Sequence, residues 1–126
     1  MELKNNLYNI ADKTTLKEGL DYTLSLHADC PIYAAHFPGK PVTPGVCLLM
    51  VAKELLGDAL NYELTLSEVK NAKFLSVVSP AEDKELVCEI RSIEIYDDDV
   101  YAKITMRTTA EVKAKMSIMC TIHDNI

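Results

Sequence analysis

The chain has 126 residues, of which 48% are hydrophobic and 25% charged, and its formal net charge is −6. This length predicts a single domain spanning residues 1–126, and the composition is typical of a soluble globular protein. An acidic chain without a basic run is poorly suited to bind nucleic acid. No apolar run approaches the roughly 18 residues that a membrane-spanning helix needs.

The first residues, MELKNNLYNIADK, lack the apolar stretch of a signal peptide, so we expect a cytoplasmic protein. We expect residues 1–20 to form a short lead with one helical turn near residues 7–10 and a turn at residues 17–19. The segment DYTLSLHA then alternates apolar and polar residues, which predicts a strand at residues 21–28.

Residues 29–45, DCPIYAAHFPGKPVTPG, contain four prolines and two glycines. Because proline fixes φ and restricts the residue before it, this composition predicts a structured loop. The loop leads into an expected helix at residues 44–56, with Thr43 as its cap, Pro44 in its first turn and Gly57 at its end. Val46 to Ala52 are seven consecutive apolar residues, so we expect this helix to be buried on all sides.

The remaining sequence supplies segments that could surround the helix. Alternating or apolar patterns predict strands at residues 62–69, 71–78, 84–96, 100–108 and 112–122. The apolar positions change parity near Arg91 and Ser92, which predicts a bulge, and three aspartates at 97–99 predict a turn. Short gaps between the last three strands favour antiparallel hairpins. We therefore expect an α+β fold, in which a curved antiparallel sheet wraps around one helix.

The cysteines are Cys30, Cys47, Cys88 and Cys120. They form no C-x-x-C pair and no cluster with histidine, so the spacing predicts neither a zinc site nor a disulfide framework. Cys47 falls in the first helical turn, where the pKa of a thiol can drop. A nucleophilic thiol there would suit a thioesterase, although the surrounding apolar run favours buried packing.

The stretch HFPGKPVTPGV, residues 36–46, resembles the H-F-P-G-x-P-x-x-P-G-V signature of the (3R)-hydroxyacyl-[acyl carrier protein] dehydratases. A weaker likeness covers residues 20–122. The resemblance implies the hot-dog fold, an antiparallel sheet wrapped around a long central helix. It also implies a homodimer, a higher homo-oligomer or a heterodimer with a related subunit, with the active site at the subunit boundary. The substrate would be carried on the phosphopantetheine of acyl carrier protein or coenzyme A, and no further cofactor is expected.

Dehydration of a 3-hydroxyacyl thioester needs a base for a weakly acidic C–H and a donor for the thioester oxygen. The resemblance assigns the base to His36, whose imidazole titrates near neutral pH, and the donor to the Gly45 N–H at a helix N-terminus. The expected substrate contacts are Tyr33, Phe37, Val46, Leu49 and Met50. An acidic carrier protein would meet this acidic chain through local lysines, with Lys40, Lys53, Lys70 and Lys73 as candidates.

The chain departs from the dehydratase pattern at Met50. The dehydratases carry Glu or Asp on the central helix fourteen residues after the histidine, and this chain has Met50 there. Losing a general acid typically costs about 10²–10⁴-fold in rate. Glu54 is the nearest carboxylate on the helix, roughly 6 Å further along its axis.

Three interpretations remain open. The leading one is a dehydratase of fatty-acid or related acyl-chain biosynthesis, a hydro-lyase whose acid comes from Glu54, water or a partner chain. The second is a related hot-dog enzyme, such as an acyl thioesterase or a hydratase of short or unusual acyl chains. The third is a catalytically weak subunit that binds acyl thioesters or completes a heterodimer.

Overall fold

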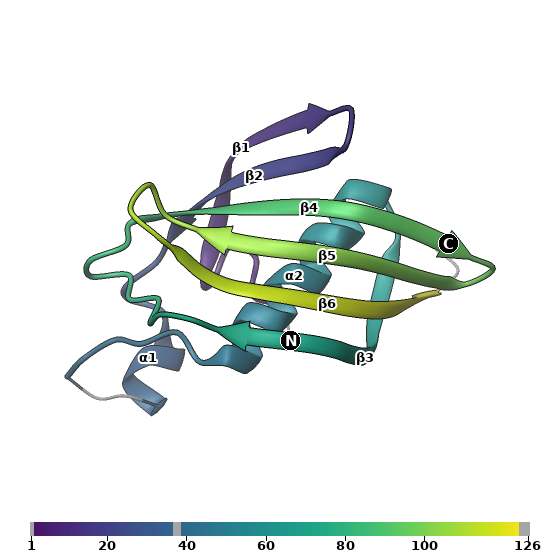
Figure 1. Ribbon diagram of the computed structural model, residues 1–126. Coiled ribbons are helices and arrows are strands. Elements are labelled where there is room, and N and C mark those ends of the chain that lie inside the picture. Colours follow the sequence, from purple (N-terminus) through teal and green to yellow (C-terminus); the bar gives the residue numbers. More distant parts are fainter. Residues whose placement is uncertain (1, 37–38, 124–126) are drawn as a thin grey trace.

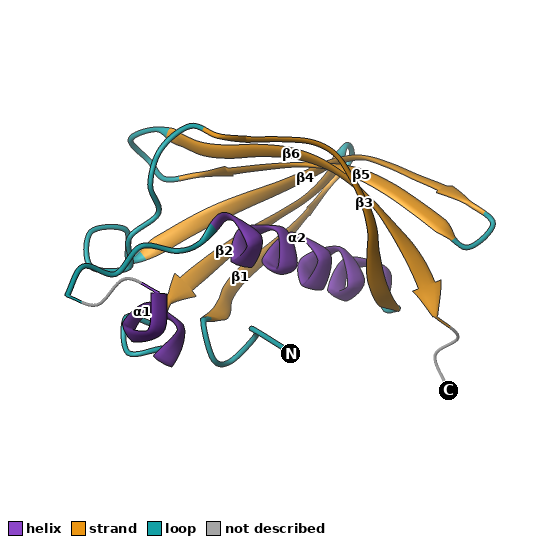
Figure 2. Ribbon diagram, turned by 90° about the horizontal axis from the view of Figure 1, so that it is seen from below, coloured by secondary structure: helices purple, strands orange, loops and turns teal. Residues whose placement is uncertain are grey.

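The computed structural model describes residues 2–36 and 39–123 and shows a curved, six-stranded antiparallel sheet with a helix along its concave side (Figures 1 and 2). The strand order across the sheet is β1-β2-β4-β5-β6-β3. This arrangement confirms the expected α+β fold. The elements are β1 Tyr8–Leu16, β2 Gly19–Leu26, α1 Pro31–His36, α2 Gly45–Leu60, β3 Glu63–Phe74, β4 Glu85–Tyr96, β5 Asp99–Arg107 and β6 Val112–His123.

The N-terminal region differs from its expected form, because residues 8–16 form strand β1 rather than a lead with a helical turn. β1 pairs antiparallel with β2 at the edge of the sheet, from Tyr8 opposite Leu26 to Leu16 opposite Gly19. Most of its side chains are exposed, so the apolar alternation that predicts a strand is absent. Gly19 allows β2 to approach β4, since a Cβ there would lie 1.9 Å from the carbonyl oxygen of Ile90.

Helix α2 is longer than expected and has a different cap at each end. Gly57 lies inside the helix, where a Cβ would be 2.8 Å from the carbonyl oxygen of Tyr62, so its missing side chain lets the chain turn back closely. The helix ends at Leu60, followed by Asn61 in a left-handed conformation. At the other end Pro44 occupies the cap position without a side-chain hydrogen bond, so the expected cap by Thr43 is wrong.

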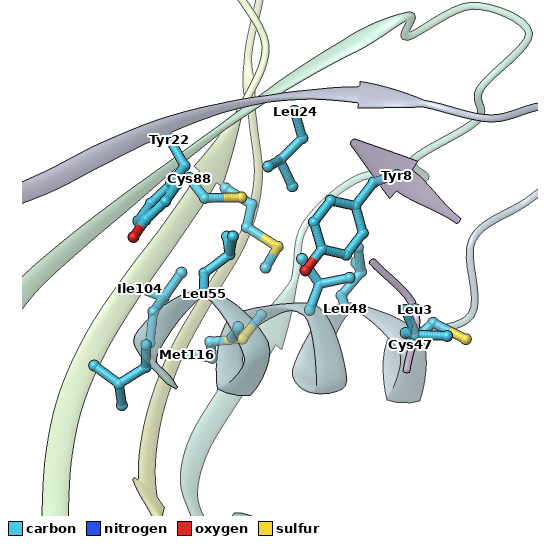
Figure 3. Packing of buried hydrophobic residues seen from close by; sticks show 14 of the residues in the cluster. Leu3, Tyr8, Tyr22, Leu24, Cys47, Leu48, Leu55, Cys88, Ile104 and Met116 are labelled. Carbon is cyan, nitrogen blue, oxygen red and sulfur yellow. The ribbon is translucent and has the colours of Figure 1, made fainter. Parts of the chain in front are cut away.

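The apolar run of α2 is buried on one side only. Cys47, Leu48, Val51 and Ala52 face the core, where they join side chains of the sheet that include Tyr22, Leu24, Cys88, Ile104 and Met116 (Figure 3). Val46, however, is 64% exposed. Leu49 and Met50 are half-buried. The expectation of a helix buried on all sides is therefore wrong for the single chain, because its sheet covers one face of α2.

The later strands follow the sequence patterns closely. Their antiparallel pairing is confirmed, and the bulge in β4 appears as a register shift between Arg91 and Glu94, with Ser92 at φ 57°. β3 joins the expected strand at residues 62–69 to the first half of the one at 71–78. It ends at Phe74, so the expectation of a strand at residues 75–78 is wrong, and it pairs with β6 through two register shifts. No helix within the described ranges is long and apolar enough to cross a membrane.

Candidate functional site

The two residues of the expected chemistry lie on two different helices. His36 is the last residue of α1 and is exposed, and Gly45 is the first residue of α2. α1 lies beside the N-terminal end of α2, at the same end of the molecule (Figures 1 and 2). Phe37, an expected substrate contact, falls outside the described residues.

A pocket of about 360 Å³ opens at the N-terminus of α2. Gly45 and Leu48 form its helical side, and the chain that leaves β3 forms the opposite wall. The first N–H groups of a helix have no intrahelical acceptor, so the Gly45 amide is available to a carbonyl oxygen. The lining is mostly apolar and comprises Val42, Thr43, Gly45, Leu48, Phe74, Leu75, Ser76, Val77 and Val78.

Tyr33 does not present its hydroxyl to this pocket. Its side chain is 3% exposed, and its hydroxyl shares a 2.9 Å hydrogen bond with the hydroxyl of Thr43, which is 5% exposed. Burial raises the pKa of Tyr33, although the hydrogen bond to Thr43 opposes the rise. The backbone N–H of Thr43 in turn donates to the carbonyl of Val78, 2.8 Å away, in the opposite wall. Tyr33 thus connects α1 to the rim of the pocket.

His36 and the expected contacts on α2 all lie outside the lining of this pocket in the described chain. Val46 is exposed, and Leu49 and Met50 lie on the partly covered face of the helix. Leu48 is the α2 side chain beyond Gly45 that lines the pocket. It lies three residues after Gly45 and hence on the same face of the helix. Helical periodicity in the sequence could therefore have predicted it as a pocket residue. The sequence near residues 74–78 could not have predicted that they form the opposite wall. They reach the helix through the pairing of β3 with β6, which is a contact between distant parts of the chain.

Glu54 is engaged elsewhere in the chain. Its carboxylate accepts hydrogen bonds from the backbone N–H groups of Leu3 (2.8 Å) and Lys4 (3.0 Å) and from the hydroxyl of Tyr8 (2.9 Å). The Tyr8 side chain points toward α2 (Figure 3). Burial and the nearby Glu54 carboxylate raise the pKa of Tyr8 well above its usual range, which keeps the phenol a donor.

A second, more polar pocket of about 420 Å³ lies along the C-terminal half of α2, and Glu54 and Asp58 line it. Asp58 accepts a 2.6 Å hydrogen bond from the Tyr22 hydroxyl and pairs with Lys13 at 3.3 Å. The carboxylates of Glu54 and Asp58 therefore bind β1, β2 and the N-terminal segment to α2. Within the described residues, Glu54 does not line the pocket at Gly45.

The cysteines show no sign of nucleophilic activation. All four are buried and free. Burial raises the pKa of Cys47, and the neighbouring Cys30 raises it further, so the drop considered for a thiol in the first helical turn does not occur. Among the residues that the structure describes, no group of three or more His, Cys, Asp or Glu side chains could hold a metal ion.

Comparisons with known proteins agree with the signature. The family model for ApeI-like dehydratases, described as ApeI dehydratase, matches residues 12–115. The 3-hydroxyacyl-[acyl-carrier-protein] dehydratase FabZ of Rickettsia canadensis is 31% identical over 94 residues, which cover 66% of this chain and 65% of that protein. The FabZ of Rickettsia massiliae is 38% identical over 61 residues, 41% of each chain. These matches span less than two thirds of the length of either relative.

Solved structures with the same fold include both dehydratases and thioesterases. The dehydratase heterocomplex ApeI:P from Xenorhabdus doucetiae aligns with a TM-score of 0.71 at 15% identity, over 90% of this chain and 97% of that chain. The thioesterase HI1161 from Haemophilus influenzae aligns with a TM-score of 0.64 at 14% identity, over 95% of this chain and 81% of that chain. These likenesses confirm the expected hot-dog fold, and at such identities they show the fold alone.

Proposed function

The chain belongs to the ApeI-like dehydratase family, and from this premise we propose that it acts on 3-hydroxyacyl thioesters as a hydro-lyase of fatty-acid or related acyl-chain biosynthesis. One observation carries the proposal. The signature that begins at His36 leads directly to Gly45, where a helix N-terminus opens on a mostly apolar pocket. An apolar pocket with one well-placed backbone donor suits an acyl thioester.

In this proposal His36 removes the proton from the carbon next to the thioester carbonyl. The Gly45 N–H donates to the thioester oxygen while negative charge develops there. The C–O bond at carbon 3 then breaks, a double bond forms between carbons 2 and 3, and the hydroxyl leaves as water. Because Met50 replaces the acid, the proton for the leaving hydroxyl must come from protonated His36, water or a partner chain. We propose that Glu54 is not its source, and the hydrogen bonds that its carboxylate accepts from the N-terminal segment support this choice.

We place the carrier arm, the phosphopantetheine of acyl carrier protein or coenzyme A, at the open side of this pocket. Of the four candidate lysines, Lys70 pairs with Glu68 at 2.9 Å and Lys53 lines the other pocket. Lys40 and Lys73 are exposed, one in the loop before α2 and one next to Phe74. These two lysines are the proposed contacts for a carrier phosphate or an acidic carrier protein. The protein itself needs no further cofactor.

We also propose that the working unit contains two chains. Apolar side chains in the pocket lining and next to it stay open to solvent: Leu75 is 58% and Val77 55% exposed in the lining, and Val46 on α2 is 64% exposed. β3 is an edge strand next to them, and an edge strand needs a partner or protection. A second copy of the chain or a related subunit would cover this surface, and the existence of ApeI:P as a heterocomplex supports the second option. In a mixed dimer, a chain with Met50 in place of the acid would be the catalytically weak, thioester-binding member.

The experiment is to give the purified chain 3-hydroxyacyl thioesters of several lengths, on coenzyme A and on acyl carrier protein, and to follow the 2-enoyl product. We expect His36→Ala to lower kcat/KM by about 10²–10⁴-fold, as loss of a general base does. The matched control His123→Ala, another exposed histidine, should leave it unchanged. If water is lost only after a dehydratase-like partner is added, this chain is the catalytically weak subunit of a mixed dimer. Release of free thiol without water loss identifies a thioesterase, and no reaction in any mixture overturns the proposal.

Met50→Glu tests whether the geometry of the family persists around the missing acid. If it does, restoring the carboxylate should raise the rate of water loss by about tenfold or more, equivalent to about 1.4 kcal/mol of transition-state stabilisation. Met50→Gln is the matched control, because it has similar size and polarity without the acidic proton. Equal rates for both variants would show that residue 50 no longer faces the reacting atoms.

A further inference from the structure

We propose that the buried hydrogen bond between Tyr33 and Thr43 positions His36 relative to the Gly45 amide, which makes Tyr33 and Thr43 positioning residues of the proposed dehydration. The inference rests on the proposed function for its kinetic effect and on the structure for the position of the His36 ring. In this inference Tyr33 positions His36, whereas the sequence predicts that it contacts the substrate.

The first step concerns how α1 is held. α1 has only six residues, too few to be stable by itself, so its orientation depends on tertiary contacts. Tyr33 is its buried residue, and Cys30 just before it is buried as well. His36 is exposed at the C-terminal end of the same short helix, one turn after Tyr33. The position of its imidazole therefore depends on how the Tyr33 side chain packs and which partner it hydrogen-bonds.

The second step concerns what Tyr33 binds. Within residues 2–36 and 39–123, its hydrogen bond with Thr43 is the one side-chain hydrogen bond that joins α1 to the segment before α2. Both hydroxyls are nearly inaccessible to solvent, at 3% and 5% residue exposure, so neither can exchange its partner for bulk water. Removing one partner leaves the other buried without a hydrogen bond, which is unfavourable.

The third step runs from Thr43 to the reacting amide. Thr43 is separated from Gly45 by Pro44 alone, and the proline ring fixes φ there at −60°. The N–H of Thr43 is bound to Val78 in the opposite wall. The Thr43 hydroxyl would ordinarily be expected to cap α2, but it is bound to Tyr33 instead. A stiff and doubly anchored segment thus links the helix that carries His36 to the helix that begins with Gly45.

Proton abstraction is sensitive to this link, because the base and the carbonyl donor must meet one substrate at the same time. A displacement of about 1 Å can cost about 10²-fold in rate. Substrate binding in the apolar pocket depends much less on the position of His36. Loosening the link should therefore lower kcat while KM changes little.

The test uses Tyr33→Phe, which keeps the ring, and Thr43→Val, which keeps the volume. We expect each to lower kcat by about tenfold with KM within about twofold, and the double variant to lower it no further than either alone, because one shared interaction is lost. Thr43→Ser retains the hydroxyl and should preserve the rate. Tyr22→Phe is the matched control: it removes a buried tyrosine hydrogen bond, to Asp58, without touching this link, and should leave kcat unchanged.

A second readout does not need turnover. The chain has three histidines, so the ring signals of His36 can be assigned in NMR spectra by their loss in His36→Ala. Tyr33→Phe and Thr43→Val should shift or broaden these signals, and Tyr22→Phe should not. The inference would be overturned if the His36 signals stayed unchanged in these variants. It would also be overturned if the loss of kcat in the double variant equalled the product of the two single losses. If the wild-type chain shows no water loss but the His36 signals still move, the proposed reaction fails while the positioning role stands.

Discussion

The tip of the Phe74 ring lies against Gly45, where a side chain on that residue would begin. A Cβ built on Gly45 would be 3.0 Å from the ring atom Cζ and 3.1 Å from Cε2. The ring and the start of α2 thus form one corner of the pocket. Because Phe74 is exposed, the ring has room to turn away.

Gly45→Ala should disturb function more than stability. The ring of Phe74 can shift by a few tenths of an ångström, and alanine is the better helix former, so we expect the free energy of unfolding to change by less than about 1 kcal/mol. The methyl group and the displaced ring should nevertheless narrow the pocket and slow thioester turnover. Urea unfolding and kinetics measure the two effects. Adding Phe74→Ala should relieve the contact and recover turnover; a double variant as slow as Gly45→Ala would contradict this account.

Glu54 should matter for stability and not for catalysis. Glu54→Gln keeps the size of the side chain but turns an NH₂ toward donors on Leu3, Lys4 or Tyr8, so we expect a loss of about 1–3 kcal/mol in the free energy of unfolding. The exposed Glu85 provides the control, since Glu85→Gln should cost little. If the variant is fully folded and its turnover nevertheless collapses, Glu54 is the missing acid after all.

Asp58 should make stability depend on acidic pH. Burial by itself raises the pKa of Asp58, but hydrogen bonds from Tyr22 and Lys13 outweigh burial and hold this pKa below its ordinary value of 3.8. The Asp58 carboxylate therefore binds a proton more readily in the unfolded state than in the folded state. The stabilisation is fully present above about pH 5 and is lost as pH falls below about 4.

The measurement compares Asp58→Asn with the wild-type chain by chemical denaturation between pH 7 and pH 2.5. The difference in the free energy of unfolding should be largest at neutral pH and should shrink as pH falls below about 4. Tyr22→Phe, which removes the main interaction that lowers this pKa, should weaken the same pH dependence. A difference that stays constant down to the lowest pH would refute the assignment.

The thiols should be inert while the protein is folded. Cys47 is buried with a raised pKa, and burial raises the pKa of Cys120 to about 11. Since the thiolate is the reactive form, we expect a disulfide reagent to label the cysteines only after unfolding in denaturant. Cys47→Ala should retain turnover of any thioester substrate. Rapid labelling of one thiol in the native protein, lost in Cys47→Ala, would instead point to a nucleophile.

Lys113 should hold the pocket wall in place. Its buried ammonium group pairs with Glu111 at 2.9 Å and Asp83 at 3.3 Å, and it donates to the carbonyl of Val77 at 2.9 Å. Lys113→Ala leaves Asp83 without its cation, so we expect a loss of about 3 kcal/mol in the free energy of unfolding. Lys115→Ala, an exposed neighbour on the same strand, is the control. Equal stability of the two variants would show that the ion pairs of Lys113 contribute nothing to the free energy of unfolding.

The amino-acid sequence by itself determined the fold class and the departure from the family's chemistry. The alternation in β4, β5 and β6 and the parity change at the β4 bulge are local patterns, because each follows from which side of a strand faces the core. The loss of the helix acid is likewise a matter of residue identity, since Met50 is not ionisable. The signature at residues 36–46 indicates the family from residue identity alone.

Only the tertiary structure decided how these parts meet. β1 carries polar residues on both faces because it lies at the sheet edge, and Gly57 stays inside α2 because Tyr62 turns back against it. The partners of Glu54 lie about fifty positions away in the chain, and the Phe74 wall reaches Gly45 through β3–β6 pairing. Contacts between residues so far apart depend on how the whole sheet curves around the helix, and local periodicity carries no information about that.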